Sequence, residues 1–164
     1  MIRVTVWNEF QHERTQEKVK EIYPDGIHTC IAKFLGQEEE LSVRTAVFDE
    51  KEHGLTEEVL ANTDVLVFWN HMLQEEFSDD VVFTGWFAGG EVFRSGCTFT
   101  RGLGKIFYFQ PGHEEYPIYH MPVIQKIIKN GVRWCVPVVR RPAPLDNAWV
   151  NPSTEEVYLS SHQK

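Results

Sequence analysis

The sequence predicts an α/β protein built around a parallel sheet. The N-terminal residues 2–7 form a run of β-branched and apolar side chains, and two more runs of strand length follow at 41–48 and 64–69. A helical pattern lies between each pair of runs, and strands that alternate with helices pair in parallel through crossover connections. With 164 residues, the chain is long enough for one domain with a genuine core.

The first half of the chain supplies three strands and two helices. The strand at 2–7 ends at Asn8, where a polar loop begins. After it, Gly36 caps a helix, and Thr56 caps a second, short helix that ends at Leu60. Apolar residues recur at helical spacing in the first of these helices, at Ile27, Cys30, Ile31, Phe34 and Leu35.

The alternation of strands and helices stops in the second half of the chain. Residues 78–82 predict the start of a helix, which Gly85 and the Gly89-Gly90 pair then break. Two strands at 91–100 and 105–109, joined by a glycine-containing turn, predict a hairpin. Pro122 then opens a helix that runs towards Trp134, with one apolar face of Val123, Ile124, Ile127 and Ile128.

Two regions follow from this pattern: an α/β domain over residues 1–136 and a polar, proline-containing tail over residues 137–164, expected to be extended or disordered. The net charge of −8 and the absence of a basic cluster argue against a nucleic-acid partner. The apolar runs are too short to span a membrane. Three cysteines without a CxxC pair fit a reducing compartment, so we expect a cytoplasmic protein.

Polar loops after the strands are the candidate site. Ligands of open parallel sheets bind beyond the carboxyl ends of the strands, where the loops converge. That rule selects three loops, at residues 8–13, at Asn70-His71, and at residues 112–115. We expect Asn8, Glu9, Asn70 and His71 to line a common crevice there.

The leading catalytic pair is His113 with Glu115, supported by His71. A carboxylate close to an imidazole holds its tautomer and raises its basicity. The alternative is that each histidine only hydrogen-bonds within its loop. For His12, in a charged stretch, a solvated structural role is favoured, and His28 is also interpreted as structural.

Three other chemistries each have a structural alternative. Imidazole and glutamate ligands would suit zinc, but no HExxH or paired-ligand motif is present, so a divalent metal stays an alternative without assigned residues. Cys97 lies in a strand pattern, which favours a packed thiol over a nucleophile. Aromatic residues either stack on a sugar or simply pack, and those in question are Trp69, Trp86, Tyr116 and Tyr119.

Several long blocks resemble the ThuA-like (trehalose utilisation) family. At the N-terminal side these are residues 6–13, 21–28 and 53–56, and at the C-terminal side residues 91–102 and 107–114. The resemblance implies a flavodoxin-like, class I glutamine amidotransferase-like fold, a three-layer sandwich around a parallel sheet. In those amidotransferases a His-x-Glu pair follows a late strand, and His113-Glu114-Glu115 looks like that pair.

The resemblance has a gap between about Val82 and Thr84, where family members carry several dozen more residues. It implies a protein of sugar metabolism that acts on a keto-disaccharide by His/Glu acid–base chemistry, as an isomerase- or lyase-type enzyme and not a glutamine amidotransferase. The alternatives are a non-catalytic sugar-binding module, including one that works as a homo-oligomer through the hairpin, or an inactive shortened family member. The remaining sheet closes if the strand at 105–109 pairs beside the strand at 64–69.

Overall fold

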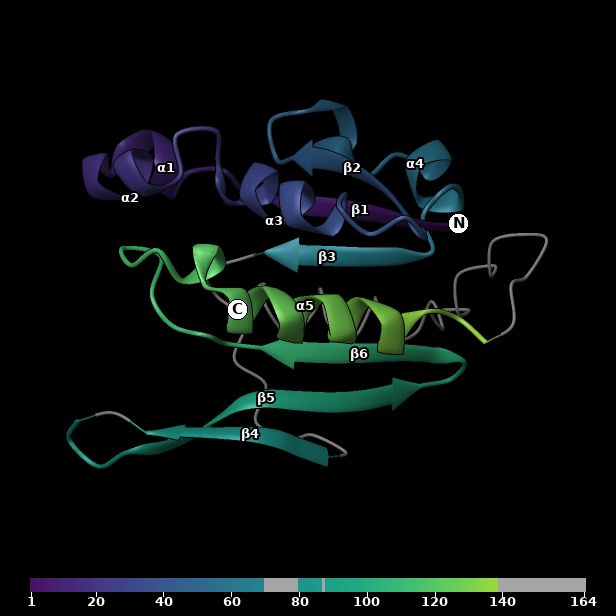
Figure 1. Ribbon diagram of the computed structural model, residues 1–164. Coiled ribbons are helices and arrows are strands. Elements are labelled where there is room, and N and C mark those ends of the chain that lie inside the picture. The colour runs from purple at the N-terminus through teal and green to yellow at the C-terminus, as the bar shows by residue number, and fades with distance from the viewer. Residues whose placement is uncertain (70–79, 87, 139–164) are drawn as a thin grey trace, which may run out of the picture.

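The computed structural model describes residues 1–69, 80–86 and 88–138, and within them the chain forms two sheets (Figure 1). One is parallel with strand order β2-β1-β3, and the other is antiparallel with order β4-β5-β6. The α/β class is therefore confirmed. No strand pair joins the two sheets in the described part of the chain, so the predicted closure of 105–109 on 64–69 does not occur.

The parallel sheet is the centre of the N-terminal half. β1 (Ile2–Asn8) lies between β2 (Leu41–Val47) and β3 (Val65–Trp69), and it is paired in parallel with both. Its last five residues are buried, as a central strand with helices on both faces requires. All three strands match their predicted positions to within a residue.

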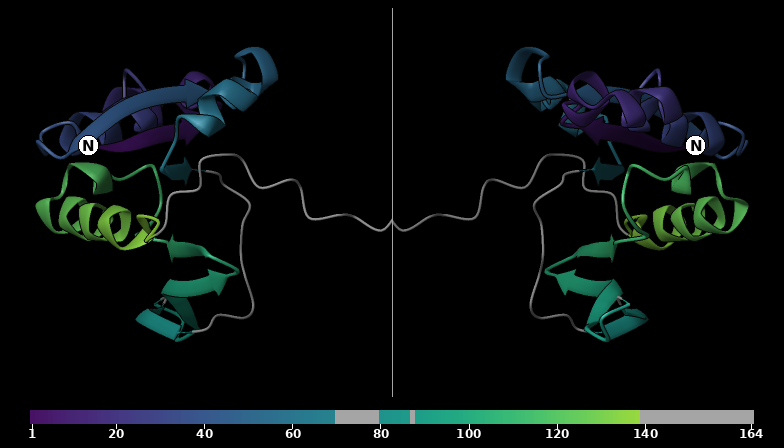
Figure 2. Two further views of the ribbon diagram at one scale, coloured as in Figure 1. Left: turned by 90° about the vertical axis from the view of Figure 1, so that its right-hand side faces the viewer. Right: turned by 90° about the vertical axis from the view of Figure 1, so that its left-hand side faces the viewer.

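Helices cover both faces of this sheet (Figure 2). α3 (Ile27–Leu35) and α5 (Pro122–Cys135) lie on one face, and the short α4 (Glu57–Ala61) lies on the other. Thr56 caps α4 as predicted, because its hydroxyl accepts a hydrogen bond of 3.3 Å from the Val59 amide. Four short elements were not predicted: α1 (His12–Thr15), α2 (Glu17–Ile22) and the 3-10 turns Lys51–Gly54 and Ile118–His120.

The second sheet contains the predicted hairpin and one unexpected strand. β5 (Val92–Arg101) and β6 (Gly104–Phe109) are joined by a two-residue turn in which Gly102 adopts a φ of +58°. β4 (Asp80–Trp86) pairs antiparallel with β5, so the predicted helix start at 78–82 is wrong for its described residues 80–82. The run Val-Val-Phe-Thr has high strand propensity, and pairing with β5 decides its conformation.

α5 packs on the core with part of the predicted face. Val123 is exposed, whereas Ile124 and Ile128 pack on the core and Val132 is buried within it. Gly131 also faces inward, and a Cβ there would lie 2.4 Å from Phe107 of β6. The helix therefore approaches β6 closely at this glycine, and its buried face is centred one turn later than the sequence pattern indicated.

Most of the core belongs to the parallel half. Among the buried hydrophobic residues of the described chain, only Cys97 and Phe99 come from the antiparallel sheet. The burial of Cys97 inside β5 agrees with its interpretation as a packed thiol. Among the described residues, no helix combines the length and apolar character that a bilayer crossing requires.

Candidate functional site

A buried carboxylate joins two of the three loops predicted to converge. Oε1 of Glu114, in the turn after β6, lies 2.7 Å from Nδ1 of His12, at the start of α1. Oε2 of the same carboxylate lies 3.5 Å from Nδ1 of His113. The Glu114 side chain is only 5% exposed, so this charge is largely removed from water and placed between two imidazoles.

A second polar cluster lies behind His12 and fixes the loop that carries it. The Asn8 amide donates to Oε1 of Glu13 at 2.6 Å, and the same oxygen accepts from the Ile27 amide at 2.9 Å. The Asn8 amide also lies 3.1 Å from Nδ1 of His28. Burial lowers the pKa of His28, so the ring is neutral at neutral pH and its Nδ1 accepts a hydrogen bond from the Asn8 amide. Because Glu13 is anchored here, His12 one residue earlier is held towards Glu114.

The loop between these clusters contains a backbone conformation that side chains rarely adopt. Phe10 has a φ of +52°, and its amide donates to Oδ1 of Asn8 at 2.9 Å. The Phe10 ring meets the His28 ring edge-on, with ring centroids 4.9 Å apart. A residue keeps such a backbone conformation only where surrounding contacts stabilise it, and here the buried Asn8 and His28 provide those contacts.

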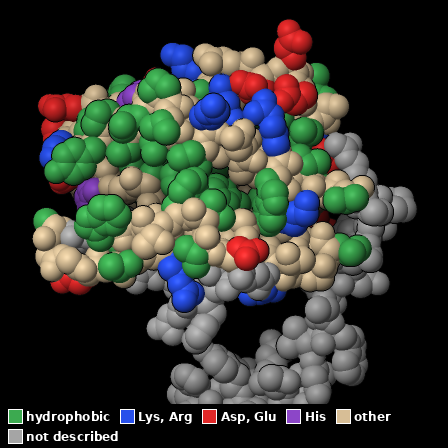
Figure 3. Space-filling model, turned by 60° about the horizontal axis from the view of Figure 1, so that its bottom comes forward, with side chains coloured by type: hydrophobic (Ala, Val, Ile, Leu, Met, Phe, Trp, Pro, Cys, Tyr) green, Lys and Arg blue, Asp and Glu red, His purple; other side chains and the backbone are tan. Residues whose placement is uncertain are grey.

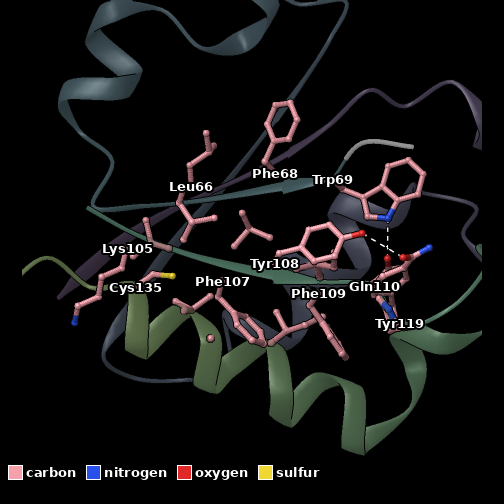
Figure 4. Close-up of a pocket in the computed structure, with 18 of the residues that line it drawn as sticks. Leu66, Phe68, Trp69, Lys105, Phe107, Tyr108, Phe109, Gln110, Tyr119 and Cys135 are labelled. Carbon is pink, nitrogen blue, oxygen red and sulfur yellow. Dashed lines mark hydrogen bonds between the residues drawn. The ribbon is translucent and has the colours of Figure 1, made fainter. Parts of the chain in front are cut away.

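Two phenols and an indole lie near the Glu114 carboxylate, and Figure 4 shows two of them, Trp69 and Tyr119. The Trp69 indole N–H donates to the Tyr119 hydroxyl at 2.7 Å, and the Tyr23 hydroxyl donates to the Tyr116 carbonyl at 2.8 Å. Burial raises the pKa of Tyr23 to about 12 and also raises the pKa of Tyr119. Both phenols therefore stay neutral at physiological pH, and in that state they supply hydrogen bonds and not negative charge.

A cavity of about 1010 Å³ opens between β3, β6 and α5, and this site lies at one end of it. Trp69, His113, Glu114 and Tyr119 line that end. Leu66, Phe107 and other apolar side chains line the rest (Figure 4). The strand-end rule thus brings Trp69 of β3 and the turn after β6 to one cavity.

The predicted residues have different positions around this cavity. Asn8 is buried in the second cluster, and Glu9 is partly buried. Asn70 and His71 lie outside the described residues. The amide of Glu115 donates to Nδ1 of His113 at 3.3 Å, but the Glu115 carboxylate pairs with Lys18 at 3.1 Å. Tyr116 is 61% exposed and does not line the cavity.

Sequence patterns did not predict two of the functional candidates, Glu114 and His12. Glu114 stood between His113 and the chosen Glu115, and no local pattern distinguishes the two carboxylates. His12 was interpreted as solvated because its neighbours are charged, yet its side chain is only 22% exposed. The strand-end rule did select the loop that contains His12, and that rule was the available signal.

The arrangement is suited to proton transfer. A carboxylate on one imidazole nitrogen fixes the tautomer and directs the other nitrogen as acid or base. Within the described residues, no group of three or more His, Cys, Asp and Glu side chains is arranged to hold a metal ion. No protein-family model matches the chain, and no curated protein matches it.

Proposed function

We propose that this chain is a ThuA-like protein of sugar metabolism that binds a keto-disaccharide at the Glu114 end of the cavity and transfers a proton there. The observation that carries the proposal is the 2.7 Å contact between Glu114 and His12, with His113 on the other carboxylate oxygen. The sugar class rests on the sequence resemblance, which also implies the flavodoxin-like, amidotransferase-like architecture.

The chemistry follows from the paired imidazoles. Nε2 of an imidazole whose Nδ1 faces a carboxylate is a general base near neutral pH. It would remove the proton from the carbon beside the sugar ketone, and the electron pair of that C–H bond would move to form an enolate. The enolate oxygen then takes a proton, the hydroxyl on the deprotonated carbon loses its proton to become the new ketone, and return of the first proton to the former carbonyl carbon completes an isomerisation. His113 lines the cavity and is therefore the base that reaches the substrate, whereas His12, which does not line it, makes the shorter contact and holds the Glu114 carboxylate in place.

A second candidate function is sugar binding without reaction. It is favoured by the cavity wall, because Trp69 and the apolar side chains of β3 and β6 offer stacking surfaces that need no acid or base. The two functions share the site and differ only in whether His113, held by Glu114, moves a proton.

Deuterium uptake separates them. The chain is incubated with 3-keto-trehalose in deuterated water, and label at the carbon beside the ketone is followed by NMR. We expect exchange in the native chain and a loss of about 100-fold or more in His113→Asn and Glu114→Gln. Glu115→Gln, whose carboxylate lies at the surface beside Lys18, is the matched control and should retain the native rate.

The outcomes are decisive in either direction. Exchange that persists in Glu114→Gln would refute acid–base chemistry at this carboxylate. Saturable binding by calorimetry with no exchange in the native chain would replace the enzyme with the binding module. Absence of both would refute the sugar assignment.

A further inference from the structure

Two hydrogen-bonded pairs line the end of the cavity where β3 and β6 end (Figure 4). In one, the Trp69 indole N–H donates to the Tyr119 hydroxyl at 2.7 Å. In the other, the Tyr108 hydroxyl donates to Oε1 of Gln110 at 3.2 Å. Trp69 is the last residue of β3 and Gln110 directly follows β6, and the two strands point the same way (Figure 1). The fold therefore brings both pairs to one end of the cavity.

Each pair retains hydrogen-bond donors that have no acceptor among the described residues. A phenol that accepts one hydrogen bond still carries its own proton, and the described part of the chain offers no acceptor for the Tyr119 proton. The Gln110 amide nitrogen carries two protons, and for these too the described residues provide no acceptor. Tyr119 is only 5% exposed, and a buried donor without an acceptor costs free energy. This end of the cavity is therefore suited to an oxygen atom that a ligand supplies.

The Tyr119 phenol is fixed by contacts of its backbone and its ring. Its amide donates to the Tyr23 hydroxyl at 3.3 Å, and its carbonyl accepts from the Gln125 side chain at 2.9 Å. The rings of Tyr119 and Tyr23 meet edge-on, with centroids 5.9 Å apart. A donor that is held in place before the ligand arrives loses little conformational entropy on binding.

The charges around this end disfavour an anionic ligand. Glu114 lines the same cavity, and its charge adds to the burial that raises the pKa of Tyr119, so the phenol lies within the field of the carboxylate. Among the described residues that line the cavity, Lys105 is the one Lys or Arg, and it lies at the opposite end (Figure 4). A carboxylate or phosphate oxygen beside Tyr119 would be repelled by Glu114, and no Lys or Arg of the described chain offsets this repulsion there.

The remaining wall is apolar. Leu66, Phe107 and Phe109 line it, and apolar side chains also surround a hollow in the space-filling view (Figure 3). An apolar pocket with a few convergent donors fits an uncharged molecule that presents one or two oxygen acceptors.

We propose that the Tyr119 hydroxyl, assisted by the Gln110 amide, binds the carbonyl oxygen of an uncharged ketone. The inference rests on the proposed function only in taking this ketone to be part of a sugar. When His113 removes a proton beside the ketone, negative charge develops on this oxygen, and hydrogen bonds to it become stronger. No bond forms or breaks at Tyr119, which keeps its proton. The substrate class is then a neutral keto sugar, and a sugar acid or sugar phosphate is excluded where its anionic group would have to enter this end.

Infrared spectroscopy of a bound ketone tests the proposal. Two probes carry a carbon-13 carbonyl: 3-keto-trehalose, and cyclohexanone, which has no sugar hydroxyls. Because a hydrogen bond lowers the carbonyl stretching frequency, we expect a lower frequency in the native chain than in Tyr119→Phe. The dissociation constant should rise by about 2- to 10-fold in this variant. Deuterium exchange into 3-keto-trehalose should fall by about 100-fold, since a donor to a developing negative charge contributes more than a donor to a neutral oxygen.

Matched controls separate this role from a structural one. Tyr116→Phe removes a phenol that is 61% exposed and does not line the cavity, so it should match the native chain in frequency and affinity. Cyclohexanecarboxylate has the same ring with a charged group, and it should bind at least about tenfold more weakly than cyclohexanone. Gln110→Met should raise the carbonyl frequency less than Tyr119→Phe does, and it provides the comparison if Tyr119→Phe lacks a cooperative melting transition.

The outcomes distinguish this inference from the sugar assignment. Equal carbonyl frequencies in the native chain, Tyr119→Phe and Gln110→Met would overturn the carbonyl site, even if 3-keto-trehalose binds and exchanges. Failure of both ketones to bind, or a carboxylate that binds as tightly as the ketone, would also overturn it. A frequency shift that depends on Tyr119 with cyclohexanone, but no binding of 3-keto-trehalose, would support the carbonyl site and refute the sugar assignment.

Discussion

The two sheets are built from similar residues but are buried to different degrees. In the parallel half, β1, α3 and β2 contribute side chains such as Val6, Leu35 and Ala46 that have no exposed surface. In the antiparallel sheet, Val81, Trp86 and Val92 are between 49% and 74% exposed. High apolar content alone therefore does not produce a core, because a strand is buried only when another layer covers its face.

This difference indicates which half of the molecule contributes most to the free energy of unfolding. Free energy gained from burial is concentrated around β1 and α3, whereas the antiparallel sheet is held mainly by its ladders and by the close approach of Phe107 to Gly131 of α5. The candidate site lies between the two: His12 belongs to the stable half, and Glu114 follows the last strand of the other.

The largest expected effect is the contrast in stability between the halves. Leu35→Ala removes a fully buried side chain of the parallel half and should lower the free energy of unfolding by about 2–5 kcal/mol. Val82→Ala, on the exposed side of β4, should change it by less than about 1 kcal/mol. Urea unfolding followed by circular dichroism gives both values. Equal losses would show that the antiparallel sheet is as well covered as the parallel one.

A smaller effect is the pH dependence that His28 adds to the parallel half. Its pKa in the folded state is lowered by burial, so below the unfolded value of about 6.5 the unfolded chain binds more protons. Stability from this group is complete above that pH and is lost as the pH falls through the lower, folded-state value. The melting temperature should therefore decrease between pH 7 and pH 5.

His28→Gln should flatten this decrease, while His53→Gln, at an exposed residue, should not alter it. The pKa of Glu38 is lowered by Lys129 and Arg133 and that of Glu40 by Arg133, so both groups act at more acidic pH and do not interfere in this window. A decrease of the same size in His28→Gln would show that another group causes it.

Sequence patterns predicted the fold where a pattern and its packing agree. β1, β2, β3 and α3 were predicted because periodicity and caps are local signals, and the hairpin was predicted from its glycine turn. β4 was not predicted because its strand conformation depends on pairing with β5, a contact that residues 80–86 do not themselves specify. The separation of the two sheets was likewise not predictable, since it depends on which distant strands pair, and pairing between distant segments leaves no local pattern.

The sequence predicted where the site lies but not which side chains form it. The strand-end rule selected the loops that carry His12, His113 and Glu114, but the choice of carboxylate depended on which side chain turns inward. Gly112, with a φ of +147°, sets the direction of the chain after β6, and Glu114 rather than Glu115 is buried. Contacts between residues 102 positions apart, such as His12 with Glu114, leave no mark on local sequence.

The contact between His12 and Glu114 is the claim on which the site depends, and nitrogen-15 NMR of the histidine side chains tests it directly. A carboxylate 2.7 Å from Nδ1 holds the proton on that nitrogen, so we expect the His12 signals of the native chain to show protonated Nδ1. In Glu114→Gln these signals should shift, and in Glu115→Gln they should stay unchanged. His12 signals that are identical in the native chain and in Glu114→Gln would contradict the account.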